Sequence, residues 1–198
     1  MAGEVGDVHL VRITSRDPAP PPLDYIAVSG GIFLDMTIHD FDMARFVTGS
    51  EVVEVFATGA VLVDEAIGAV GDLDTVVVVM THANGAITTI DNSRQAVYGY
   101  DQRVEAFGSG GMVAAGNPPT TTTTYHGPGR VEASPLPHFF LERYIPSYVS
   151  QWAGFVAMAV RGEPTPVSVH DGRAALIVAL AAWRSAREQR PVPIEGDG

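Results

Sequence analysis

The sequence predicts an α+β domain with a largely antiparallel, open-faced sheet and helices on one face. Strand candidates follow one another at 52–63, 75–82, 86–96 and 103–108. The Asn84-Gly85 pair between the second and third of them is a strong hairpin signal. Helical patterns occupy separate stretches at 30–49, 139–161 and 171–188. Strands joined by hairpins favour an antiparallel sheet, and helices outside the strand run pack on one side of it.

Composition indicates one globular domain over residues 1–198. Hydrophobic residues make up 46% and charged residues 18%, which is enough for a sizeable core. The net charge of −11 argues against nucleic acid or an anionic membrane as a partner. The absence of cysteine excludes disulfides and thiol chemistry. No signal peptide is visible and the longest apolar stretch, 174–183, is too short for a bilayer, so we expect a soluble, cytoplasmic protein.

The first half of the chain alternates strands with one central helix. Residues 8–17 alternate in polarity as a strand does, and the prolines of 18–22 end it. The helix begins after Gly30-Gly31 and closes at Gly49. Thr75 to Met80 are apolar on both faces, which predicts a central strand. We expect a turn at 98–101.

The second half is predicted to hold a long loop and two helices. Residues 109–137 are rich in Gly, Pro and Thr and indicate a loop with one short edge strand. A helix spans 139–161, with Pro146 marking a break or kink. Asp171 is a good N-cap for a final helix to Glu188, and 191–194 can form a short terminal strand.

The central helix carries the main candidates for chemistry. Asp35, His39 and Asp42 follow at i, i+4 and i+7, within an arc of about 60° on one face. Buried carboxylates and imidazoles need partners, so these groups either satisfy one another in a structural pair or line a cleft. Asp42 is expected to cap the helix or to pair locally, for example with Arg45. The other histidines are scattered singly, so no metal site is expected.

Nucleotide-binding signatures are missing. Gly108-Ser109-Gly110-Gly111 follows a strand, but Val113 stands where a dinucleotide fingerprint needs glycine, and Pro118-Pro119 occupy the place of its helix. We interpret this segment as a glycine-rich hairpin. There is no P-loop, and all 12 basic residues are arginines, so chemistry that needs a lysine amine must obtain it elsewhere.

Several motifs in register carry a family resemblance over nearly the whole chain. They are Ser15-Arg16-Asp17-Pro18, Gly30-Gly31 followed by Asp35, His39-Asp40-Phe41-Asp42, Arg45 and Gly49, then Tyr98-Gly99-Tyr100-Asp101-Gln102-Arg103-Val104-Glu105, Phe139-Phe140-Leu141-Glu142-Arg143-Tyr144 and Asp171-Gly172-Arg173-Ala174-Ala175. The sequence resembles the C-terminal domain of the Gfo/Idh/MocA oxidoreductases, most closely the inositol 2-dehydrogenase branch.

The resemblance implies residue roles for a polyol or sugar dehydrogenase. His39 would be the general acid/base, because imidazole exchanges protons near neutral pH. Asp35 would bind a substrate hydroxyl and help to fix the imidazole. Tyr98 and Tyr100 would contact the substrate, with ordinary turn packing as the alternative. Arg143 and Tyr144 could approach the cleft or lie on a helix surface.

The resemblance also implies parts that this sequence does not show. The family binds NAD or NADP in an N-terminal Rossmann domain, and both its fingerprint and a Glu-Lys-Pro segment are absent here. No cofactor-binding residues are therefore assigned, and a separate Rossmann-domain partner is possible. The open sheet face is expected to join copies into a homo-oligomer.

Three functions remain open from the sequence. The first is the substrate-binding half of an NAD(P)-dependent oxidoreductase that acts on a cyclitol or sugar CH–OH group. The second is a catalytically silent polyol-binding or assembly module. The third is a cofactor-independent lyase or isomerase that uses Asp35 and His39, which is weakened by the lack of a second acid/base group.

Overall fold

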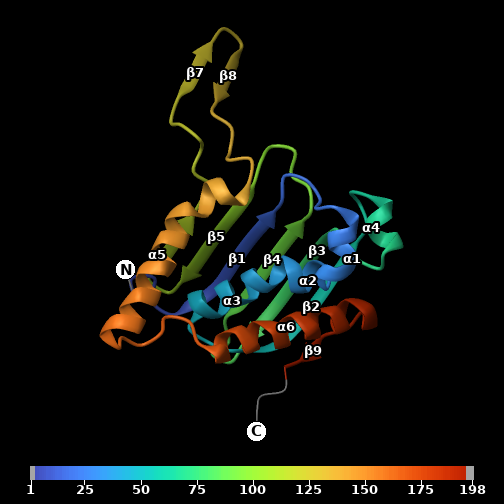
Figure 1. The fold of residues 1–198 in the computed structure, drawn as a ribbon, viewed down its shortest axis with the longest axis vertical. Helices are drawn as coiled ribbons and strands as arrows, with labels where there is room; N and C mark the ends of the chain where they lie inside the picture. Colours follow the sequence, from blue (N-terminus) through green and yellow to red (C-terminus); the bar gives the residue numbers. More distant parts are fainter. Residues whose placement is uncertain (1–2, 195–198) are drawn as a thin grey trace.

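A computed structural model describes residues 3–194 and contains a seven-stranded sheet in the order β6-β5-β1-β4-β3-β2-β9 (Figure 1). All neighbouring strands pair antiparallel except β1 and β4, which are parallel. The strands are β1 Val8–Arg16, β2 Val52–Ala60, β3 Thr75–His82, β4 Ile87–Ser93, β5 Asp101–Gly108, β6 Gly111–Ala115 and β9 Val192–Pro193. The predicted fold class is confirmed.

Helices cover one face of this sheet (Figure 1). α1 (Leu23–Ser29), α2 (Ile32–Asp35), α3 (Thr37–Thr48) and α6 (Val169–Glu188) lie on that side, with α3 against β1 and α6 against β2. The short α4 (Glu65–Ala69) follows β2. Between the helices and the sheet lies a core of fully buried side chains that includes Phe33, Phe41, Val55, Val78 and Ile90.

The opposite face of the sheet is open. Side chains alternate along each strand, so every second residue points away from the helices. On β3 these outward residues are Val77 and Val79, which are 46% and 38% exposed. β3 is an interior strand, as predicted, but only one of its two apolar faces is covered within residues 3–194.

The predicted single helix over 30–49 is wrong, because the segment is interrupted at Met36. α2 ends there and α3 starts at Thr37. The Thr37 hydroxyl lies 3.2 Å from the Ile32 carbonyl oxygen and 2.6 Å from Asn92 Oδ1 on β4. This side chain therefore ties the junction to the sheet. The preceding turn needs glycine at Gly31, where a Cβ would approach the Trp183 ring to 2.6 Å at a φ of +83°.

The prediction of one short strand within 109–137 is also wrong. After β6, the strands β7 (Thr124–Gly127) and β8 (Arg130–Ala133) form a second hairpin that projects from the body (Figure 1). Gly129 closes it with a φ of +76°, a conformation that glycine adopts without strain. The glycine-rich segment 108–111 is the β5–β6 turn, as predicted.

The C-terminal elements differ from prediction in detail. α5 (Phe140–Arg161) continues through Pro146, so of the predicted break or kink the break is absent. α6 is capped by Ser168 rather than by Asp171, which instead closes a capping box as the third residue of the helix. Two of the four residues 191–194 form the terminal strand β9.

Candidate functional site

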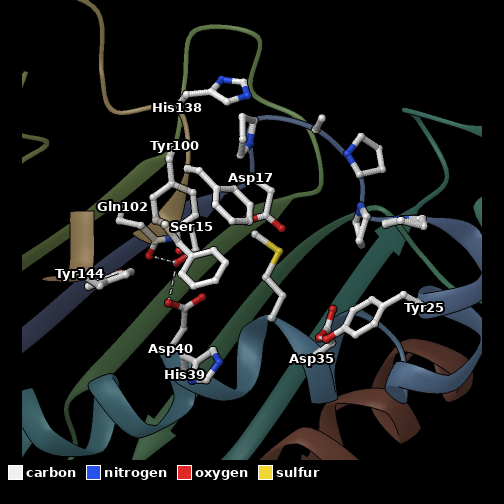
Figure 2. A pocket seen from close by; sticks show the side chains of 18 of the residues that line it. Ser15, Asp17, Tyr25, Asp35, His39, Asp40, Tyr100, Gln102, His138 and Tyr144 are labelled. Carbon is white, nitrogen blue, oxygen red and sulfur yellow. Dashed lines mark hydrogen bonds between the residues drawn. The ribbon is translucent and has the colours of Figure 1, made fainter. Parts of the chain in front are cut away.

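A pocket of about 1010 Å³ opens where the end of β1, the start of α3, β5 and α5 meet (Figure 2). Its volume is at the upper end of the roughly 300–1,000 Å³ that is usual for ligand sites. The lining combines carboxylates, amides and histidines with aromatic rings and prolines. Its residues are Ser15, Asp17, Pro18, Ala19, Pro20, Pro21, Pro22, Tyr25, Asp35, Met36, His39, Asp40, Met43, Tyr100, Gln102, His138, Phe139, Phe140, Tyr144 and Tyr148.

Three of the four predicted site residues meet in this pocket. Asp35 and His39 come from the two sides of the helix break, and Tyr100 comes from the turn before β5. Tyr98 does not line the pocket. Its hydroxyl donates to Asp101 Oδ2 at 2.7 Å and accepts from Arg16 Nη1 at 2.9 Å. Tyr98 therefore stabilises the end of the sheet instead.

Asp35 is held by partners other than His39. Tyr25 donates its hydroxyl to Asp35 Oδ1 at 2.6 Å (Figure 2). Arg94 Nη1 donates to Oδ2 at 3.0 Å. The hydrogen bond to Asp35 raises the pKa of the Tyr25 phenol, so Tyr25 stays a proton donor at neutral pH. The expectation that Asp35 fixes the imidazole is not met in this arrangement, because among residues 3–194 the hydrogen-bond partners of Asp35 are Tyr25 and Arg94, not His39.

Arg94 was not predicted as part of the site, yet it joins the site to the core. Its side chain is fully buried, and Nη2 bonds Asp72 Oδ2 at 3.2 Å. Asp72 in turn accepts from the Ile32 amide, the first residue of α2, at 2.9 Å. One guanidinium therefore connects Asp35 with the N-terminus of the helix that carries it.

A second polar network lies beneath the pocket. The buried Asp40 accepts from Ser15 Oγ at 2.6 Å and from Asn92 Nδ2 at 2.7 Å. Burial raises the pKa of Asp40 to about 6, against the opposing effect of these two hydrogen bonds. Burial also raises the pKa of Asp17 to about 6, and the charge of Arg94 opposes this shift. Two carboxyl groups of the pocket thus have pKa values of about 6, well above the usual range of aspartate.

Aromatic rings form the opposite wall. Tyr100 and Tyr144 pack edge to face with ring centroids 6.0 Å apart. Burial raises the pKa of both phenols, so they remain neutral. Of the two alternatives for Tyr144, the structure places it in the cleft, whereas Arg143 Nη2 bonds the Gln102 carbonyl at 3.1 Å. This wall offers apolar surface beside hydroxyl donors.

One further prediction concerns a side chain outside the pocket. Asp42 pairs with Arg45 at 3.4 Å, as predicted, and Arg45 also bonds Glu51.

Within residues 3–194 no cluster of three or more His, Asp or Glu side chains could hold a metal ion. No helix in the same range has the length and apolarity needed to cross a bilayer.

The fold and the pocket define a class of protein: an α+β domain with an open sheet face and a cleft lined by carboxyl, imidazole and aromatic side chains. Residues 1–114 match the family model described as GFO/IDH/MocA C-terminal domain. The chain belongs to this family and corresponds to its C-terminal domain.

Similar proteins and solved structures agree with this family assignment. Myo-inositol 2-dehydrogenase of Thermotoga maritima is 56% identical over 98% of this chain and 58% of its own length. The crystal structure of a myo-inositol dehydrogenase from Corynebacterium glutamicum has a TM-score of 0.94 at 45% identity, covering 98% of this chain and 59% of that one. A scyllo-inositol dehydrogenase from Lactobacillus casei, with bound NAD(H) and scyllo-inositol, has a TM-score of 0.86 at 27% identity over 97% of this chain and 58% of its own. The chain therefore spans somewhat over half the length of the relatives that it matches.

Proposed function

We propose that this chain is the substrate-binding half of an NAD(P)-dependent oxidoreductase acting on a CH–OH group of a cyclitol or sugar. The observation that carries the proposal is the placement of an exposed imidazole, His39, in one pocket with the carboxylate of Asp35. The relatives named above are inositol dehydrogenases, which supports a cyclitol as the substrate.

The chemistry needs a proton acceptor and groups that hold the polyol. Oxidation of a secondary alcohol releases the hydroxyl proton as hydride leaves the carbon, and His39 is the group suited to accept that proton. Asp35 has two carboxylate oxygens with four acceptor positions, of which Tyr25 and Arg94 occupy two. The remaining positions can accept from a substrate hydroxyl, while the aromatic wall covers the C–H face of the ring.

NAD or NADP is the cofactor that this proposal requires. The nicotinamide supplies the hydride acceptor when it is bound. Within residues 3–194 the glycine-rich segment 108–111 closes a β-hairpin, so it does not fit a pyrophosphate. We infer that a Rossmann domain outside the described residues holds the dinucleotide, and that the protein works in the cytoplasm.

The first test is polyol binding by the purified chain, measured by calorimetry with myo-inositol. Asp35→Asn should weaken binding by about 10- to 100-fold, because it removes a charged hydrogen-bond acceptor. The exposed Asp24→Asn is the matched control and should bind as the wild type does. His39→Ala should lose nicotinamide reduction in any preparation that shows it. Absence of polyol binding in the wild type would contradict the proposal and favour an assembly module.

We also propose that copies of this chain associate through the open sheet face. The face is apolar at Leu10, Val77, Val79, Ile87 and Phe107, which are all exposed. Most of its charges are paired with a nearby opposite charge, as in the ion pairs of Arg16 with Asp91 at 2.5 Å and of Arg12 with Glu105 at 3.4 Å. The face is therefore close to neutral in a chain of net charge −11, and two such faces can meet with little repulsion.

Val79→Lys should shift the oligomer toward monomers, because it places a charge in the middle of this apolar face. Sedimentation velocity at several concentrations measures the shift. Val28→Lys is the matched control, since Val28 is 81% exposed on α1, away from the open face. Equal dissociation by both variants, or a monomeric wild type, would contradict association through the sheet.

A further inference from the structure

One hydroxyl beneath the pocket faces two oxygen acceptors. Ser15 Oγ lies 2.6 Å from Asp40 Oδ1 and 2.8 Å from Gln102 Oε1 (Figure 2). A serine hydroxyl has one proton and can donate to only one of them. The second contact is a hydrogen bond only if the other side chain donates a proton to Ser15 Oγ. Neither an ionised Asp40 carboxylate nor the Gln102 amide oxygen carries such a proton.

Two arrangements of protons satisfy both contacts. In the first, Asp40 is ionised and accepts from Ser15, while Gln102 turns its amide so that Nε2 donates to Ser15 Oγ. In the second, Asp40 is protonated and donates to Ser15, which donates to Gln102 Oε1. The two ends of the amide have nearly the same shape, so the turn needs no extra space.

The backbone of Gln102 is held in place, so within this residue the change between the two arrangements involves only its side chain. Its backbone amide donates to Asn117 Oδ1 at 2.8 Å, and its carbonyl accepts from Arg143 Nη2 at 3.1 Å. Ser15 lies between Gln102 and Asn92 in the strand register, so its Oγ keeps its place while its hydroxyl proton turns toward Asp40 or toward Gln102. The heavy atoms that exchange places between the two arrangements are Oε1 and Nε2 of Gln102.

We propose that Gln102 is a further substrate-contacting residue, and that Asp40 selects through Ser15 which end of its amide faces the ligand. The proposal rests on the function inferred above, in which the pocket takes a polyol. Ionised Asp40 leaves Gln102 Oε1 in the pocket as a hydrogen-bond acceptor. Protonated Asp40 leaves Nε2 there as a donor.

The environment of Asp40 places its titration in an accessible range. Burial raises its pKa to about 6, and the nearby charges of Asp91 on β4 and Asp17 after β1 act in the same direction. Tyr100 before β5 and Tyr144 on α5 also sense the charge of Asp40, and His39 is its neighbour on α3. In this proposal the acceptor state of Gln102 prevails above about pH 6, and the donor state prevails below it.

The two states discriminate between an alcohol and its ketone. A hydroxyl can donate to Oε1 or accept from Nε2, whereas a ketone oxygen can only accept. A donor at Gln102 thus adds one hydrogen bond to the ketone that the acceptor state cannot make. The affinity for ketone relative to polyol should rise by about two- to tenfold as the pH falls from 7.5 to 5.

The relay can be observed without a ligand. We expect the ¹H–¹⁵N signals of the Gln102 side-chain amide to shift between pH 5 and 8 with the midpoint of the Asp40 carboxyl signal. Asp40→Asn, which keeps a donor beside Ser15, should make them independent of pH. Ser15→Ala should do the same while Asp40 still titrates. Amide signals that stay constant in the wild type, or still shift in Ser15→Ala, would overturn the relay.

Ligand contact is tested by calorimetry with myo-inositol and its 2-keto derivative. Gln102→Met should weaken binding of both and remove the pH dependence of their affinity ratio. The exposed Gln95→Met should do neither. Undiminished binding by Gln102→Met, or a ratio that is constant with pH in the wild type, would contradict this inference alone. If neither compound binds the wild type, the proposed function fails and the substrate contact fails with it.

Discussion

Replacing Arg94 with methionine should lower the free energy of unfolding by about 3–5 kcal/mol. The guanidinium is fully buried and pairs with Asp35 at 3.0 Å and Asp72 at 3.2 Å. Methionine fills similar space but leaves both carboxylates in the interior without their cation, which is the costly way to break a buried ion pair. Urea unfolding of both proteins at pH 7 measures the loss.

A surface pair gives the matched control for Arg94. Arg12 and Glu105 are 3.4 Å apart on the open face, and their side chains are 68% and 37% exposed. Arg12→Met should change the free energy of unfolding by less than about 1 kcal/mol, because water screens this pair. Equal losses in the two variants would show that the buried position of Arg94 does not matter.

Phe33→Ala should also destabilise the fold by about 3–5 kcal/mol, through lost burial and the cavity that it leaves. Phe33 is fully buried and packs edge to face on Trp183, with ring centroids 5.3 Å apart. Because Phe33 lies on α2 just before Asp35, the same change should weaken polyol binding. Thermal or urea unfolding and calorimetry with myo-inositol measure the two effects.

The exposed Phe46 provides the comparison for Phe33. It is 81% exposed on α3, so Phe46→Ala should alter stability by no more than about 0.5 kcal/mol. A loss for Phe33→Ala no larger than this would mean that α2 is not held by the contact with Trp183.

Local signals allowed most of the sheet to be predicted. The Asn84-Gly85 turn joins β3 and β4, where the His82 amide bonds the Ala86 carbonyl at 2.9 Å. Alternating polarity located β1, and turn residues located the β5–β6 hairpin. The break at Met36 could not be predicted in this way, because it depends on the hydrogen bond from Thr37 to Asn92, 55 residues further along the chain.

The site was predictable only in part, for the same reason. The family resemblance pointed to Asp35 and His39, and both line the pocket. Ser15 and Gln102 lie in the motifs that carry the resemblance, but their contact appears only when β1 is placed between β5 and β4, which brings Ser15 beside Gln102 on one side and Asn92 on the other. Arg94 lies outside those motifs, and its role appears only from its contacts with Asp35 and Asp72. Helix periodicity suggested a common face of one helix for Asp35 and His39; the two residues lie on separate helices, α2 and α3, yet both line the same pocket.

The position of β1 has a consequence for how the protein acquires its binding site. Within residues 3–194 β1 is the first strand in the sequence, but its partners Asp91 and Glu105 follow Thr14 and Arg12 by 77 and 93 residues. The β2–β3, β3–β4 and β5–β6 pairings join strands that are consecutive in the sequence, so only short loops must close before they form. Pairings across long separations form slowly, because a large loop must close first. The floor of the pocket is therefore completed when β1 inserts between β5 and β4, which follow it in the sequence. The binding site forms late in folding.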